Sequence, residues 1–160
     1  MLNRKSTTMK NITYLNWALI VFMGICVLGI FLNFYLIWDS ADIRHIYKKH
    51  GYIGYVNIPL GFLFLYGIYQ IQRSIASSIK SNFFSFESAV FLKRGGYVLL
   101  AYTVISTIKT ILLMNVMKME ILISNSSEHG VLFIVSIGLL AVADIIKNGT
   151  RIKHENDLTI

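Results

Sequence analysis

The chain has 160 residues, a length that suits one domain. Hydrophobic residues make up 55% of it and charged residues 14%, against roughly 25% charged residues in an average soluble domain, so a soluble core could not bury its apolar surface. The formal net charge of +7 would suggest nucleic acid or anionic lipid as a partner, and the single cysteine, Cys26, excludes an intrachain disulfide.

The first predicted element is a membrane-spanning helix over residues 13–38. Its central part, from Trp17 to Trp38, reads WALIVFMGICVLGIFLNFYLIW and contains no charged residue. A helix of this length rises about 33 Å, which is enough to cross a hydrocarbon core of about 30 Å. A soluble core helix does not need apolar residues on every face for that length. The run is too long for the core of a signal peptide, so we expect a retained helix.

A short helix over residues 39–51 and a second span over residues 52–72 follow. Asp39 can cap the short helix and Gly51 can end it, and apolar residues recur on one face, which predicts a helix lying on the outer membrane surface: Ile43, Ile46 and Tyr47. Pro59 lies within the first third of the second span, where we expect a mild kink.

The segment 74–94 has the pattern of an amphipathic stretch at the membrane surface. Apolar residues recur every three or four positions between polar ones: Ile75, Ile79, Phe83, Phe86 and Val90. Ser85 is a candidate N-cap and Glu87 suits the first turn of the helix that follows. We therefore predict a cytoplasmic linker helix, with Gly95 and Gly96 as a hinge into the next span.

Two further spans complete the predicted fold, over residues 96–117 and 130–147. A short polar loop, 118–130, joins them, and Gly149 is a candidate residue for ending the last helix. A polar tail over residues 148–160 follows. The sequence thus predicts a single all-α domain over residues 1–160, a four-helix transmembrane bundle with a surface helix and a linker helix.

Small residues in the spans are candidates for helix contacts, because they let backbones approach closely. They are Gly24, Gly29, Gly61, Ser136 and Gly138. They do not form a clean GxxxG motif, so they assign no dimer face, and a homo-oligomer stays an open alternative.

The basic residues predict the orientation of the chain. The side with both termini and the linker carries ten of the 15 Lys and Arg residues, the other side carries four, and Lys109 lies inside a span. The positive-inside rule then places both termini and the linker in the cytoplasm. Direct nucleic-acid binding is not expected, because the basic residues do not form one face with interleaved aromatic residues.

Two ionisable residues fall within the predicted spans. Lys109 is a candidate functional residue by its position, or a lysine that extends its ammonium group to the membrane surface. Asp144 lies at a different depth, so we expect it to face the inner boundary with Lys147 at i+3 rather than to pair with Lys109. Glu120 and Glu128 are alternative partners for Lys109.

No catalytic or metal-binding motif is present in the sequence. It lacks H-E-x-x-H, a phosphate-binding glycine loop and a nucleophile turn, so we expect neither enzymatic activity nor a cofactor. Several potential ligands fall on the outer side: Asp39, Asp42, His45, His50, Glu128 and His129. His45 and His50 are five residues apart and point to different sides of a helix, so we expect solvated loop residues, with an outer-face sensor as the alternative.

The end of the chain resembles a known family. The run from Phe133 closes in IIKNGTRIK and then ENDLTI, which is Glu155, Asn156, Asp157, Leu158, Thr159 and Ile160, and the earlier segment FFSFESAVFLKRGG has a matching character. These stretches resemble the bacterial family named domain of unknown function 2975. The resemblance implies a small four-span protein, often encoded beside a helix-turn-helix regulator, and it implies no activity.

Two functional hypotheses follow. In the first, the protein is a non-enzymatic partner that binds a cytosolic helix-turn-helix regulator through residues 155–160, by strand addition or carboxylate capture. In the second, it is a small transporter or channel subunit in which Lys109, Asn33 and Asn57 line a polar path.

Overall fold

The protein is all-α in the computed structural model, which describes residues 2–39, 53–80, 85–113 and 119–157. These residues form one short 3-10 helix and four long helices: α1 (Leu2–Asp39), η1 (Ile53–Val56), α3 (Asn57–Lys80), α4 (Phe86–Leu112) and α5 (Met119–Asp157). Apart from Asp39, the predicted surface helix over residues 39–51 lies outside the described residues.

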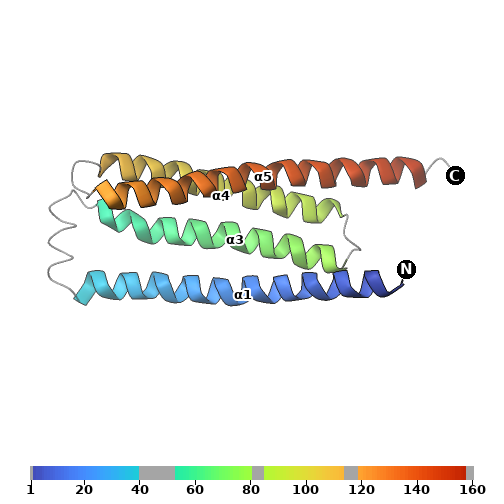
Figure 1. Ribbon diagram of the computed structural model, residues 1–160, viewed down its shortest axis with the longest axis horizontal. Coiled ribbons are helices and arrows are strands. Elements are labelled where there is room, and N and C mark those ends of the chain that lie inside the picture. Colours follow the sequence, from blue (N-terminus) through green and yellow to red (C-terminus); the bar gives the residue numbers. More distant parts are fainter. Residues whose placement is uncertain (1, 40–52, 81–84, 114–118, 158–160) are drawn as a thin grey trace.

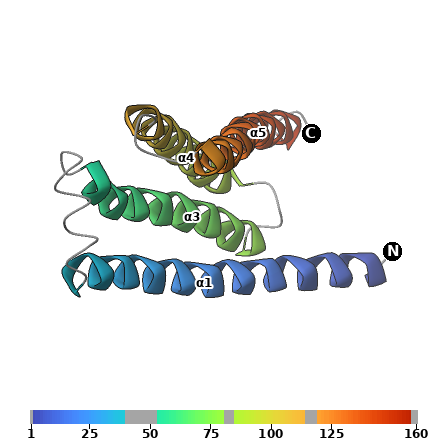
Figure 2. The same ribbon diagram turned by 60° about the vertical axis from the view of Figure 1, so that its left-hand side comes forward.

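The four long helices form an open row rather than a closed bundle. Consecutive helices run in opposite directions, and α1 packs on α3, α3 on α4, and α4 on α5 (Figure 1). Figure 2 shows α1 and α5 at opposite edges of this row. Both termini lie at the same end (Figure 1), as an even number of antiparallel helices requires. The predicted all-α class is confirmed, with a different arrangement of the helices.

Three helices are long and apolar enough to cross a membrane, which supports a multi-pass membrane protein. They are Lys10–Tyr35 in α1, Phe86–Leu112, and Leu122–Asn156 in α5. No described side chain from Lys10 to Tyr35 is fully buried within the protein. Apolar side chains exposed on so many faces of one helix are typical of a helix that is surrounded by lipid.

Helix α3 does not reach the same apolar composition, because its second half contains several polar residues. Two of them contact the neighbouring helices: the Gln72 side chain donates to Asn16 of α1 at 3.0 Å, and the Arg73 guanidinium lies 4.4 Å from the Phe91 ring centroid of α4. Its residues rise about 36 Å, so α3 is long enough to cross a membrane. Two of the three apolar helices, α1 and α5, lie at the edges of the row, whereas α3 lies between α1 and α4.

Helix α1 begins earlier than predicted, at Leu2 instead of residue 13. The basic segment before the span lacks proline and glycine, and contains residues that favour helices, so the helix of the span extends through it.

The α-helical part of α3 begins at Asn57, so Pro59 lies in its first turn. A backbone N–H in the first turn has no intrahelical acceptor, and the missing N–H of proline costs nothing there. The physical reason for the predicted kink is therefore absent.

The prediction of a separate linker helix is wrong, because the described residues 74–80 and 86–94 belong to two longer helices. Helix α3 continues to Lys80, and α4 begins at Phe86. The predicted cap is confirmed: the Ser88 backbone N–H donates to the Ser85 hydroxyl oxygen at 3.0 Å, and Glu87 lies in the first turn. Helix α4 continues through Gly95 and Gly96 without interruption, so these two residues are not a hinge.

Gly95 and Gly96 instead allow α4 to approach both neighbours. A Cβ atom on Gly95 would lie 2.9 Å from Ile71 Cγ1 of α3, and one on Gly96 would lie 2.9 Å from Leu140 Cδ2 of α5. Real Cβ atoms do not come so close, so a side chain at either position would require the facing side chain or the helix to shift. Adjacent glycines thus serve two different helix interfaces.

The predicted contact residues divide into two groups. A Cβ atom on Gly61 would lie 2.9 Å from Ile30 Cγ1, and Ser136 is completely buried, so these two are confirmed. Cβ atoms at the other three positions would meet nothing within 4 Å, so their prediction as contact residues is wrong: Gly24, Gly29 and Gly138.

Helix α5 is 39 residues long and includes segments that were predicted as loop and tail. It begins at Met119, so most of the predicted loop 118–130 is helical. It also continues through Gly149 to Asp157, so Gly149 does not end it. A glycine inside a helix costs about 1 kcal/mol, which a long helix tolerates when the flanking residues favour it.

Candidate functional site

The interior of the helix row is unusually polar. Among the described residues, eight buried side chains are polar and six are hydrophobic. Small hydroxyl residues are typical of contacts between membrane helices, because they let backbones approach and can bond to backbone carbonyl groups. Three of them form a stripe on α4 with a spacing of three or four residues: Thr103, Ser106 and Thr110. This stripe places hydroxyl groups along the second half of α4, toward the end that lies opposite the termini.

Lys109 of α4 contacts Asn57 of α3 at this end. The ammonium nitrogen donates to Asn57 Oδ1 at a distance of 2.6 Å. Lys109 lies in the last turn of α4, where the helix dipole favours a cation, and Asn57 is the first residue of α3. Hydrogen bonds from a charged donor are short and strong, so this contact fixes the register of the two helices.

The partner of Lys109 differs from the acidic residues that the sequence suggested. Glu128 of α5 attracts the ammonium group electrostatically, while the hydrogen bond goes to an amide. The side chain of Glu120 lies outside the described ones. The contact joins residues 52 positions apart, and no local pattern in the sequence indicates it.

Asn33 of α1 lies close to the same cluster. Asn33 and Asn57 line one pocket of about 220 Å³ between α1 and α3. The Asn33 side-chain oxygen is buried, and it has no hydrogen-bond partner among the described residues. A buried acceptor without a donor costs about 1–3 kcal/mol. The structure thus brings together Asn33, Asn57 and Lys109, the three residues that the transporter hypothesis grouped.

His129 forms a second polar contact beside Lys109. The ring nitrogen Nε2 lies 3.3 Å from the Thr110 hydroxyl oxygen, and Nδ1 is buried without a partner among the described residues. A pocket of about 410 Å³ adjoins this contact between α4 and α5, and hydroxyl groups line part of it: Thr103, Thr107, Thr110 and Ser126. The rest of the lining is mainly apolar, and the three threonine hydroxyls already donate to backbone carbonyl groups of α4.

The expectation that His129 is a solvated loop residue is wrong, because only 9% of it is exposed. His129 lies seven residues before Ser136, which lies seven before Ala143, and all three are buried against α4. This seven-residue spacing is visible in the sequence and predicts that His129 faces another helix. The polar residues between 124 and 129 favoured a loop instead. His45 and His50 lie outside the described residues, and within the described ranges no group of three metal-binding side chains occurs.

Asp144 lies toward the other end of the row and pairs with α4. Its Oδ1 atom accepts a hydrogen bond from the Lys93 ammonium group at 2.8 Å. Lys147, the partner that we expected, instead lies over the Phe86 ring, with Nζ 5.9 Å from the centroid. Lys109 and Asp144 therefore have different partners at different depths, and the ion pair between them does not form.

The end of α5 extends from the row as a helix. Every residue from Arg151 to Asn156 is exposed, and the Arg151 Nε atom lies 3.5 Å from a Glu155 carboxylate oxygen. Asp157 is the last residue of α5, so the segment that was predicted to dock by strand addition is helical up to that point. Leu158, Thr159 and Ile160 lie outside the described residues.

Comparisons with known proteins give one match. The model of a family described as "Protein of unknown function (DUF2975)" matches residues 45–160, which is more than half of the chain and includes both segments that carried the resemblance. No curated protein and no solved structure matches the chain.

Proposed function

The chain belongs to the DUF2975 family of proteins of unknown function, and from this premise we propose that it is a non-enzymatic anchor in the bacterial inner membrane. In this role it holds a cytosolic protein at the membrane through the end of α5. The observation that carries the proposal is the uninterrupted course of α5, from its apolar part to Asp157, with all residues from Arg151 to Asn156 exposed. Exposed residues at the end of a helix are accessible to a partner protein.

The proposed topology has all four long helices in the membrane and both termini in the cytoplasm. Helix α3 lies between α1 and α4, and its length allows a complete crossing. The end of the row with both termini carries most of the basic residues, which indicates the cytoplasmic side. A homo-oligomer in the membrane is compatible with this topology, because α1 exposes its apolar side chains at one edge of the row.

The partner that we propose is a helix-turn-helix regulator encoded beside this gene, as the family resemblance implies. The contact surface is a helix face, with Ile152 (55% exposed) between the charged residues Arg151 and Lys153. Residues 155–160 contribute the remaining part of the surface. An apolar residue on an exposed helix can insert into a groove of the partner, which is a recurring mode of peptide recognition.

A pull-down of the regulator tests this proposal. The full chain in detergent should retain the regulator, while deletion of residues 155–160 or the substitution Ile152→Ser should reduce recovery at least about tenfold, which corresponds to about 1.4 kcal/mol. Ile123→Ser is the matched control, because Ile123 lies on the same helix near its other end and is 59% exposed. Equal recovery with the deletion, the Ile152 variant and the control would rule out the docking role.

A second candidate function is a transporter or channel subunit, and one observation favours it. Lys109 and Asn57 form a hydrogen bond inside the helix row, next to the pocket that Asn33 also lines. A cation at membrane depth is costly, and such residues often mark the path of an ion or substrate.

Flux into liposomes tests this second candidate. Lys109→Met should abolish flux that the wild-type chain supports, because it removes the charge from the polar cluster. Lys80→Met is the control, since Lys80 is exposed at the last residue of α3, outside the cluster. Unchanged flux with Lys109→Met, or no flux with the wild-type chain, would count against a transport role.

A further inference from the structure

A groove runs between the first half of α4 and the last part of α5, at the end of the row that carries the termini. One hollow of about 670 Å³ lies along α5 and is lined by Lys147, Thr150, Arg151 and His154. A second hollow of about 200 Å³ lies along α4 and is lined by Val90, Lys93, Arg94 and Tyr97. Phe86 and Lys147 line both hollows, so the two adjoin, and we call them together the Phe86 groove.

The Phe86 groove is basic along α5. Lys147, Arg151 and His154 are four and three residues apart, which places them on one face of the helix. Helix α4 adds Lys93 and Arg94. Two acids offset part of this charge: Asp144 pairs with Lys93, and Glu155 with Arg151. Within the described ranges, Arg94 and Lys147 form no ion pair, so the groove keeps an excess of positive charge.

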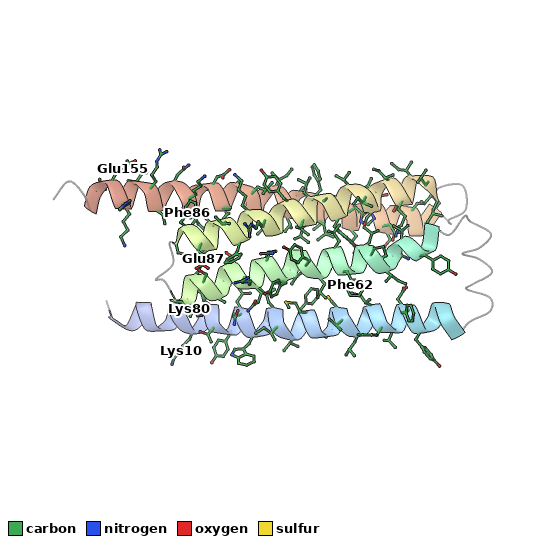
Figure 3. The ribbon with its side chains drawn as sticks, turned by 180° about the vertical axis from the view of Figure 1, so that it is seen from behind. Lys10, Phe62, Lys80, Phe86, Glu87 and Glu155 are labelled. Atoms are coloured by element: carbon green, nitrogen blue, oxygen red, sulfur yellow. The ribbon has the colours of Figure 1, made fainter. Side chains whose placement is uncertain are left out.

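The same groove is apolar along α4. Phe86 and Tyr97 are 60% and 55% exposed, and they lie three turns apart on α4 with Val90 between them. Figure 3 shows Phe86 at the start of α4, beside α5. Exposed aromatic rings are typical of the boundary between a membrane and water. The groove thus combines a positively charged part outside the apolar region of α5 with an apolar part along the span of α4.

We propose that the Phe86 groove binds one anionic phospholipid. Its phosphodiester group lies between Lys147 and Arg151, and an acyl chain follows Val90 and Tyr97 along α4. Charge complementarity selects this occupant, because basic pockets between membrane helices bind anionic headgroups, and an acidic peptide would leave the apolar part unused. The proposal rests on the proposed membrane placement of α4 and α5, and it shares only Arg151 with the proposed docking surface.

Native mass spectrometry of the purified full chain tests the proposal. Detergent micelles are titrated with phosphatidylglycerol or phosphatidylcholine, and we expect selective retention of one phosphatidylglycerol. Lys147→Gln/Arg151→Gln should weaken that binding about tenfold or more, because each basic residue near a membrane surface contributes about 1 kcal/mol. Phe86→Ala should weaken it by a smaller factor of about three through loss of apolar contact.

Lys10→Gln/Lys153→Gln is the matched control, because it removes the same charge from exposed positions outside the groove. Figure 3 shows Lys10 pointing away from the other helices. This control, and the charge-preserving Lys147→Arg/Arg151→Lys, should stay within about threefold of wild type. If the control pair weakens binding as much as the groove pair, the attraction is diffuse and the site does not exist.

Competition experiments distinguish a phospholipid from a soluble phosphate compound as the source of the bound phosphate group. Soluble glycerophosphoglycerol and inorganic phosphate should displace the lipid only weakly, because they lack the acyl chain that the apolar part holds. Displacement at concentrations equal to that of the lipid would overturn the proposal in favour of a small-anion site. Displacement by an acidic peptide, with no preference between the two lipids, would overturn it in favour of a protein partner. The regulator pull-down reports separately on the docking role.

Discussion

At the scale of single residues, the contact between Lys109 and Asn57 joins α3 and α4 through one charged hydrogen bond. The free energy that this hydrogen bond contributes depends on the surroundings that each side chain would have without its partner. Without Asn57, the ammonium group remains at membrane depth with an electrostatic attraction to Glu128 and no amide acceptor. Without Lys109, Asn57 keeps a polar amide at the pocket that Asn33 lines. The two residues should therefore be energetically coupled.

A double-mutant cycle in detergent measures this coupling. We expect Asn57→Leu and Lys109→Leu each to lower the free energy of unfolding, and the double variant to lose less than the sum. The coupling energy should be about 0.5–2 kcal/mol, the range for hydrogen bonds between membrane helices. Additive losses would mean that the two side chains act independently.

Other single residues show which features a sequence reveals. Ser85 could be predicted as an N-cap, because a cap depends on residues within one turn of helix. The partner of Lys109 could not be predicted, because it depends on the register between two helices. His129 was assigned to a loop because its neighbours are polar, and its burial follows from the packing of α5 on α4.

At the scale of the elements, the helices are longer than their apolar segments. Apolar composition correctly indicated three helices that are long and apolar enough to cross a membrane, because a lipid environment requires apolar side chains. Apolar composition did not predict the ends of the helices, because a helix continues beyond its apolar region wherever no residue ends it. Gly149 illustrates this point: glycine lowers helix stability by about 1 kcal/mol, and the residues around it outweigh that cost. The linker prediction was wrong for the same reason, because the described residues 74–80 extend α3 and residues 86–94 belong to α4.

Adjacent helices in this row depend on glycine at specific positions. We expect Gly96→Ala to lower the free energy of unfolding by about 1–3 kcal/mol, because the new methyl group would overpack against Leu140 and the Ser136 carbonyl oxygen. Gly138→Ala is the matched control on α5, where a Cβ atom would meet nothing within 4 Å. It should be neutral or stabilise the chain by up to about 1 kcal/mol through helix propensity.

Unfolding in detergent, followed by the loss of helical circular dichroism, gives both values. A neutral Gly96→Ala variant would show that α4 and α5 can separate slightly without cost. A destabilising Gly138→Ala variant would point instead to a contact with a second copy of the chain, since this position is open within one chain.

At the scale of the whole molecule, the four antiparallel helices place both termini at one end (Figure 1). Three of these helices are apolar enough to cross a membrane by themselves, and α3 is not among them. If α3 stayed outside the membrane, the three remaining crossings would place the termini on opposite sides. The position of the termini therefore decides whether α3 crosses the membrane.

Labelling of intact cells tests this topology. In a Cys26→Ser background, Lys10→Cys and Lys153→Cys should both resist a membrane-impermeant maleimide, because the proposed topology places both in the cytoplasm. Met119→Cys should react, since Met119 is the first residue of α5 at the opposite end and is 68% exposed. Labelling of either Lys10→Cys or Lys153→Cys alone would show an odd number of crossings.

Helix α5 has one mechanical consequence for the proposed anchor. Its membrane part and its exposed end are one rod, described from Met119 to Asp157 without a joint. The part from Lys147 to Asp157 rises about 16 Å, so a change of about 10° in tilt would displace its tip by about 3 Å. Bilayer thickness sets the tilt of such helices. A change in bilayer thickness around the membrane part of α5 would therefore move a protein that is held at the tip of this helix.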